Sequence, residues 1–169
     1  MGARRLLAAV VIAFSANSAS AQGYPAVKSR VSPVKVSERV WYVQGGPGAA
    51  SAANEGYNSN AGFVITDEGV VVIDALGSPA LAEELLAQIR RVTPLPVRHV
   101  IVTHYHADHI YGLQAFKAAG ATVIAQRAAG SYLNSDTAVQ RLKASREELF
   151  PWIDETTRRP CQTKAFMLI

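Results

Sequence analysis

A short segment of the chain places four side chains that can bind metal ions within six consecutive positions. It contains three of the four histidines of the protein, His104, His106 and His109, together with Asp108. Imidazole nitrogens and carboxylate oxygens are the ligands that Zn²⁺ accepts at neutral pH. A single histidine is more often a packed or solvated residue, and we interpret His99 in that way. Four ligand-type residues at this spacing instead predict a metal site.

The flanking sequence predicts a strand, a short loop and a helix around these residues. An apolar run at 100–102 precedes them. Apolar residues with helical spacing follow, at Ile110, Leu113 and Phe116. Side chains alternate along extended backbone, so His104 and His106 are expected to point the same way. Asp108 and His109 lie where the helix begins and can turn back toward the same point.

Upstream residues predict a hairpin and a crossover helix. The hairpin pairs 61–66 with 70–74 around a Gly-containing turn at 67–69.

Ser78 is a suitable N-cap for the crossover helix, with Pro79 at the first helical position. Apolar residues form a stripe on this helix, at Leu81, Leu85, Ile89 and Val92. The segment 97–103 then returns as a strand, which predicts a parallel β-α-β unit with the site at its carboxyl edge. A further buried strand is expected at 122–125, followed by helical patterning over 138–150.

The segment His104-Tyr105-His106-Ala107-Asp108-His109 resembles the H-x-H-x-D-H signature of the metallo-β-lactamase superfamily of hydrolases. The segments 60–64 and 71–75 resemble the first hairpin of that fold, and the resemblance runs from about 34 to 152. It is also similar to secreted quinoprotein-relay-type zinc metallohydrolases. The resemblance implies an α/β fold, the αββα sandwich of that superfamily.

The resemblance also implies a mechanism and a ligand set. His104 and His106 would hold one metal and Asp108 and His109 a second, with a shared hydroxide as nucleophile. Asp108 would additionally steer the hydroxide or receive its proton, as a catalytic residue. Asp74 would orient a metal-ligating histidine. The expected cofactor is zinc, one or two ions, with iron and manganese as alternatives. The expected reaction is hydrolysis of a small-molecule substrate that the sequence does not identify.

One departure from the family pattern qualifies this expectation. Complete members supply further histidines and a bridging carboxylate from a second half, and no histidine follows His109 here. We therefore expect a sandwich truncated to its N-terminal αβ half, whose uncovered sheet face could support a dimer. The alternative function is a non-catalytic, metal-binding remnant of such an enzyme. The loop at 45–60, rich in small residues, either borders the active site, as in the resembled family, or is a surface connector.

The chain ends suggest how the protein is organised. Residues 1–21 have the arginines, short apolar run and Ala-Ser-Ala cleavage site of a signal peptide, which predicts a periplasmic or secreted protein with no membrane attachment after cleavage. Residues 22–157 are expected to form the partial metallo-β-lactamase domain. Residues 158–169 have no clear pattern and could be read from a shifted frame.

Composition excludes two other classes of function. The formal charge of +4 falls to +2 once Arg4 and Arg5 leave with the signal peptide, and no basic cluster is interleaved with aromatic residues, so nucleic-acid binding is not expected. Cys161 is the only cysteine, which excludes an intrachain disulfide and a cysteine-based zinc site. The 148 residues that remain after cleavage are enough for one compact domain.

Overall fold

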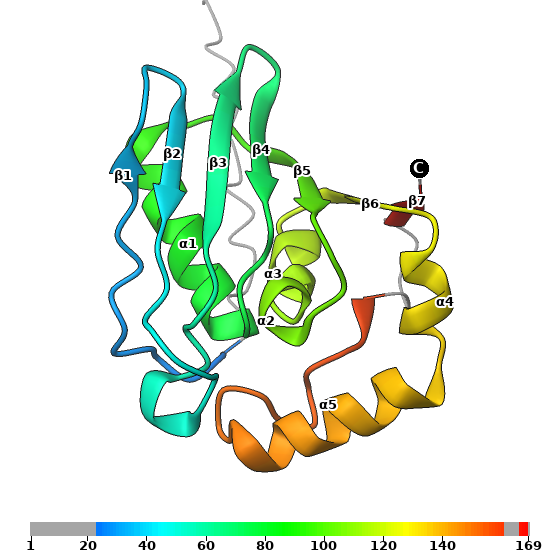
Figure 1. Cartoon of the computed structure of the whole chain (residues 1–169). Coiled ribbons are helices and arrows are strands. Elements are labelled where there is room, and N and C mark those ends of the chain that lie inside the picture. Colours follow the sequence, from blue (N-terminus) through cyan, green and yellow to red (C-terminus); the bar gives the residue numbers. More distant parts are fainter. Residues whose placement is uncertain (1–22, 161–165, 169) are drawn as a thin grey trace, which may run out of the picture.

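The computed structural model describes residues 23–160 and 166–168, and these form one mixed sheet with helices packed against it (Figure 1). The predicted signal peptide and Cys161 lie outside the described residues. The sheet has seven strands in sequence order, β1 to β7. They are β1 (Val34–Lys35), β2 (Val40–Val43), β3 (Ala61–Thr66), β4 (Gly69–Ile73), β5 (Val97–Val102), β6 (Thr122–Ala125) and β7 (Phe166–Leu168).

The sheet changes direction at β4. Strands β1 to β4 pair antiparallel, whereas β4, β5, β6 and β7 pair parallel. Parallel neighbours need a crossover connection, and α1 (Pro79–Val92) supplies it between β4 and β5. The carboxyl ends of β4 and β5 therefore lie at the same edge of the sheet, as the sequence predicts.

Helices α1 and α3 (Leu113–Ala118) cover one face of the sheet, behind the strands in Figure 1. The side chains that point to this face are fully or almost fully buried, among them Val72, Val100 and Val123. Residues of alternate register, such as Val71, Ile73 and Ile101, point to the other face and remain partly exposed. This alternation places the core between the sheet and the two helices.

Local sequence explains where the first helix begins. The Ser78 hydroxyl accepts a hydrogen bond from the backbone N–H of Leu81, and Pro79 occupies the first turn, where no N–H is needed. Leu81, Leu85 and Ile89 are buried as expected, but Val92, the last residue of the helix, is exposed.

The helix that follows the histidine motif differs from the expectation of one continuous helix. It is divided into α2 (Ala107–Ile110) and α3, with the break at Tyr111 and Gly112. The break lets Gly112 approach the turn after β4, to which its N–H donates a hydrogen bond at Leu76 O (3.2 Å).

The structure also differs from the sequence analysis at three other points. A short helix, α4 (Ala129–Leu133), precedes α5 (Asp136–Glu148) and was not predicted. The hairpin turn has two residues rather than three, because Gly69 already pairs with Thr66. Residues 158–169 show no clear sequence pattern, and within them β7 pairs with the edge of β6. Pairing of this kind depends on an available strand edge, which local sequence does not reveal.

Helix α5 crosses beyond the carboxyl ends of β4 and β5 and faces the site from the opposite side (Figure 1). Within residues 23–160 and 166–168, no helix has the length and apolar character needed to cross a membrane.

Candidate metal centre

A sharp turn after β4 brings Asp74 to the carboxyl edge of the sheet. Asp74 and Leu76 have left-handed backbone, with φ of 60° and 64°, which is uncommon outside glycine. The Asp74 N–H still donates to Ile101 O of β5 (2.9 Å), so the strand pairing holds the turn in place. Such backbone persists where surrounding contacts fix it, and it is often found at functional sites.

The Asp74 carboxylate connects the loop after β5 to α2. Its Oδ1 accepts the Thr103 N–H (2.8 Å), and its Oδ2 accepts the Thr103 hydroxyl (2.7 Å). The same Oδ2 lies 2.8 Å from His109 Nδ1. Both oxygens of this buried carboxylate are therefore engaged with neighbouring residues, which suits a group that supports a site more than one that binds the ligand itself.

These contacts fix the tautomers of two histidines. A carboxylate accepts only, so His109 Nδ1 must carry the proton that it shares with Asp74. The Thr103 hydroxyl donates its hydrogen bond to Asp74. Its oxygen lies 2.9 Å from His104 Nδ1, so in this second contact the hydroxyl oxygen accepts and His104 Nδ1–H is the donor. Each neutral ring then has an unprotonated Nε2, the form in which imidazole binds a metal.

The three histidine rings of the motif are adjacent. The His104 ring centroid lies 4.6 Å from that of His106 and 4.1 Å from that of His109. Between the first two, Tyr105 turns away and packs against the ring of Tyr132 on α4, with centroids 4.2 Å apart. This contact anchors the loop and leaves His106 free to face the pocket described below.

Asp108 is held by the loop between β2 and β3. Its Oδ2 accepts a hydrogen bond from Asn58 Nδ2 (3.2 Å), and its backbone carbonyl accepts one from the Ser59 hydroxyl. The same Oδ2 lies 3.7 Å from His109 Nε2. The small-residue loop therefore borders the site, which decides between the two roles considered for it.

The electrostatics of the cluster follow from these contacts. Burial raises the pKa of Asp74, but hydrogen bonds from His109 and Thr103 outweigh burial, so the pKa of this carboxyl lies below its usual value. The hydrogen bond to Asp74 raises the pKa of His109. Partial desolvation and the neighbouring His109 and His106 lower the pKa of His104, although its side chain remains exposed. The lowered pKa of His104 keeps this imidazole neutral, and a neutral imidazole can bind a metal ion.

The donor set fits a metal ion. One ligand atom from each of Asp74, His104 and His109 lies within 4.8 Å of the others. His106 and Asp108 are not part of this group and line the adjacent pocket. Histidines that bind a metal through one ring nitrogen usually donate the other N–H to a carboxylate or another oxygen, and the Nδ1 contacts of His104 and His109 match this arrangement.

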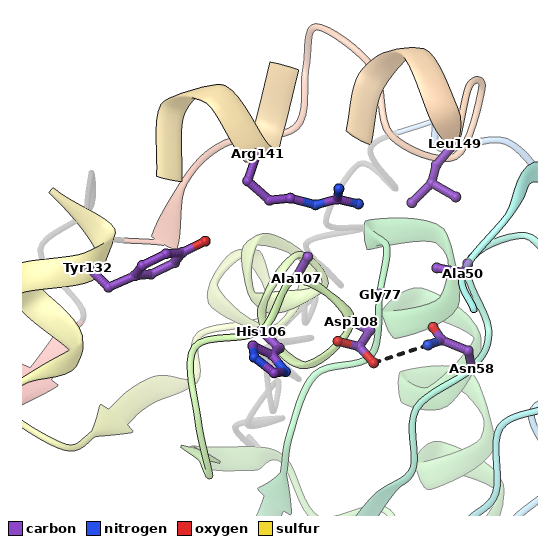
Figure 2. A pocket seen from close by; sticks show the side chains of 10 residues that line it. Ala50, Asn58, Gly77, His106, Ala107, Asp108, Tyr132, Arg141 and Leu149 are labelled. Carbon is purple, nitrogen blue, oxygen red and sulfur yellow. Dashed lines mark hydrogen bonds between the residues drawn. The ribbon is translucent and has the colours of Figure 1, made fainter. Parts of the chain in front are cut away.

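A pocket of about 230 Å³ opens directly beside the histidine cluster. Figure 2 shows His106 and Asp108 on one side and Arg141 of α5 across from them, with the Tyr132 hydroxyl directed toward the same space. Leu149 and Ala50 add apolar surface. A small molecule in this pocket would contact both the motif and α5.

The family model named Metallo-beta-lactamase superfamily matches residues 54–163. This range holds Asp74, the histidine motif and the strands and helices that position them. The chain belongs to the metallo-beta-lactamase superfamily. The resemblance seen in the motif and the sandwich-type α/β fold class are thereby confirmed.

Curated relatives of this superfamily member are similar over part of their length. A linear primary-alkylsulfatase from Pseudomonas sp. (strain ATCC 19151) is 35% identical over 49 residues, which are 29% of this chain and 9% of the relative. A metallo-beta-lactamase type 2 from Bacillus cereus is 32% identical over 68 residues, which are 40% of this chain and 27% of the relative. The chain thus spans about a quarter or less of these two proteins.

Solved structures agree on the fold. A metallo-beta-lactamase from Pontibacter korlensis superposes with a TM-score of 0.53 at 24% identity, over 63% of this chain and 48% of that one. A stereoselective inverting sec-alkylsulfatase from Pseudomonas sp. superposes with a TM-score of 0.52 at 20% identity, over 69% and 18% of the two chains. At these identities the likeness concerns the fold alone.

The structure brings together every site residue predicted from the sequence, His104, His106, Asp108, His109 and Asp74, at the carboxyl ends of β4 and β5. Their individual roles stay predictions. Sequence reasoning missed the residues that orient or face them: Thr103, Asn58, Ser59, Tyr132 and Arg141. Thr103 could have been noticed from its place beside the motif, but the others come from distant segments with no local signal.

Proposed function

We propose that this protein is a zinc-dependent hydrolase of the metallo-beta-lactamase superfamily. His104, His106, Asp108 and His109 would hold one or two metal ions, and Asp74 would orient His109. The observation that carries the proposal is a pair of contacts, from His104 Nδ1 to Thr103 Oγ1 and from His109 Nδ1 to Asp74 Oδ2, which favour the Nδ1–H tautomer and leave each Nε2 available to a metal. When bound, zinc lowers the pKa of a coordinated water to about 7 and polarises the oxygen of the group under attack.

The side chains around the centre have separate tasks in this proposal. Asp74 stabilises the Nδ1–H form of His109 because its Oδ2 accepts a 2.8 Å hydrogen bond from that N–H. Asn58 donates to Oδ2 of Asp108, so this oxygen is held beside His109 Nε2 and can take up a proton during hydrolysis. Tyr105 and Tyr132 stack and fix the loop that carries His106.

One observation favours a second candidate, a metal-binding module without turnover. Thr103, His104 and His106 are exposed, whereas electrostatic catalysis is strongest where water is excluded. Both candidates require metal binding, and they differ in whether hydrolysis accompanies it.

The experiment measures zinc stoichiometry and affinity by equilibrium dialysis on the purified protein, on His106→Ala and on His99→Ala. The control removes a histidine of β5 that lies outside the cluster. We expect zinc binding by the wild type and the control, and at least a tenfold weaker affinity in His106→Ala. The rate of hydrolysis of a panel of chromogenic esters then separates the candidates, because only the hydrolase is expected to cleave them. Absence of zinc binding by the wild type, or equal affinity in His106→Ala, would contradict the proposed site.

A further inference from the structure

A single arginine faces the metal motif from across the pocket. Of the described residues that line this pocket, Arg141 is the only one with a cationic side chain, apart from the motif histidine. It projects from the middle of α5, over the space bordered by His106 and Asp108 (Figure 2). The arrangement does not follow from the histidine motif, because α5 lies outside the β-α-β unit that carries it.

The Arg141 guanidinium retains most of its hydrogen-bonding capacity. Among the described residues it makes one side-chain hydrogen bond, to Glu148 Oε2 (2.8 Å). Both side chains of this pair are about half exposed, at 41% and 51%, and exposed pairs of this kind contribute little to stability. A guanidinium has five N–H donors, so the remaining donors are available to a ligand.

Glu148, which pairs with Arg141, is not among the residues that line the pocket. Asp108 is the only carboxylate among the described lining residues, and its Oδ2 is engaged by Asn58. The nearby Tyr132 can donate a hydrogen bond from its hydroxyl, and burial raises its pKa, so it stays protonated. Two donors thus face one space, while Leu149 and Ala50 form an apolar wall beside them.

We propose that Arg141 recognises an anionic group of the substrate, a carboxylate or an oxyanion of sulfur or phosphorus, and sets it across from the metal centre. The fork of N–H groups matches two oxygens of such an anion, and these charge-assisted hydrogen bonds are stronger than neutral ones. The substrate would combine this anion with a short apolar portion against Leu149. The proposal deepens the proposed hydrolase function and rests on it for the identification of the ligand as a substrate.

The test compares two small probes that have nearly the same shape, benzenesulfonate and its neutral counterpart methyl phenyl sulfone. Their dissociation constants are measured by NMR titration at constant ionic strength, for the wild type, Arg141→Gln and Arg91→Gln. Arg91 lies in the last turn of α1 and is exposed, so its substitution removes the same charge away from the pocket. Each protein is titrated both metal-free and zinc-loaded.

We expect the wild type and Arg91→Gln to bind the sulfonate more tightly than the sulfone. Arg141→Gln should weaken sulfonate binding about tenfold or more, with the sulfone and the zinc stoichiometry unchanged. Equal weakening of both probes, no change in Arg141→Gln, or the same loss in Arg91→Gln would overturn the proposal. Failure of the wild type to bind zinc would contradict the hydrolase function alone, since the metal-free titrations still test Arg141.

Discussion

At the scale of single residues, Asp74 determines more of the site than its distance from the motif suggests. It lies 30 positions before His104 in the sequence, yet its two oxygens receive the Thr103 backbone, the Thr103 hydroxyl and His109. These contacts select the tautomers of two imidazoles. A neutral amide at the same position could not do this, because an amide nitrogen would face an N–H donor.

We therefore expect Asp74→Asn to lower zinc affinity by about 10- to 100-fold. The substitution keeps the size of the side chain but removes the acceptor that fixes His109 Nδ1–H. The measurement is a zinc titration against a competing chelator, with circular dichroism to verify the fold. Asp67→Asn is the matched control, because Asp67 is 87% exposed on the β3–β4 turn and pairs only with Arg39 among the described residues. Unchanged affinity in Asp74→Asn would contradict an orienting role.

The sequence was informative about this site where the chemistry is local. The four ligand-type residues fall within one hexapeptide, so their types and spacing suffice to predict a metal centre. Asp74 followed from the strand pattern together with the family resemblance. Asn58 and Arg141 could not be predicted, because their proximity to Asp108 and His106 depends on how a loop and a helix pack in three dimensions.

At the scale of elements, the turn after β4 and the break between α2 and α3 form one packed unit. Ala75 N donates to His109 O (2.9 Å), and Gly112 N donates to Leu76 O (3.2 Å). A Cβ on Gly112 would lie 1.9 Å from Ala75 O and 2.7 Å from Ala82 Cβ. The glycine is required for close approach rather than for backbone conformation, since its φ is −74°.

Gly112→Ala is expected to destabilise the protein by about 1–3 kcal/mol or more, because neither backbone nor helix α1 can move away without loss of packing. The free energy of unfolding is measured by urea denaturation. Gly46→Ala is the control, since its Cβ would meet Tyr57 O at 3.4 Å, an ordinary contact. Equal stability of the two variants would contradict the prediction, because it would mean that the fold does not need Gly112 to lie close to the turn after β4.

Element boundaries show where periodicity is a sufficient guide. The crossover helix and β3 to β6 have strong caps or apolar runs and were predicted within a residue or so. The break at Gly112 was not, because helical spacing continues from Ile110 to Phe116 across it. A tertiary contact with Ala75 overrides the local pattern there.

At the scale of the whole molecule, the site links parts of the chain that are far apart in sequence. The β2–β3 loop holds Asp108, the turn after β4 holds Thr103 and His109, and α4 holds Tyr105. The sheet face that carries Ile73 and Ile101 is partly exposed in the described structure, and self-association through it stays a prediction.

Because several segments meet at the metal centre, zinc should stabilise the entire fold. A ligand that binds only the native state stabilises it by RT ln(1 + [L]/Kd), about 2.7 kcal/mol at 100 times Kd. For a domain of this size the expected rise in Tm is roughly 5–10 °C. Differential scanning calorimetry with zinc, and after chelation with EDTA, measures the shift.

The same scans on His106→Ala separate binding at the motif from binding elsewhere on the surface. The variant should lose most of the zinc-dependent rise in Tm while its metal-free Tm changes little, because the His106 side chain is exposed. Magnesium should produce no comparable shift in the wild type, since it prefers oxygen ligands to imidazole. An equal rise in Tm for His106→Ala would mean that zinc stabilises the fold without the histidine cluster, and the link between the motif and global stability would then fail.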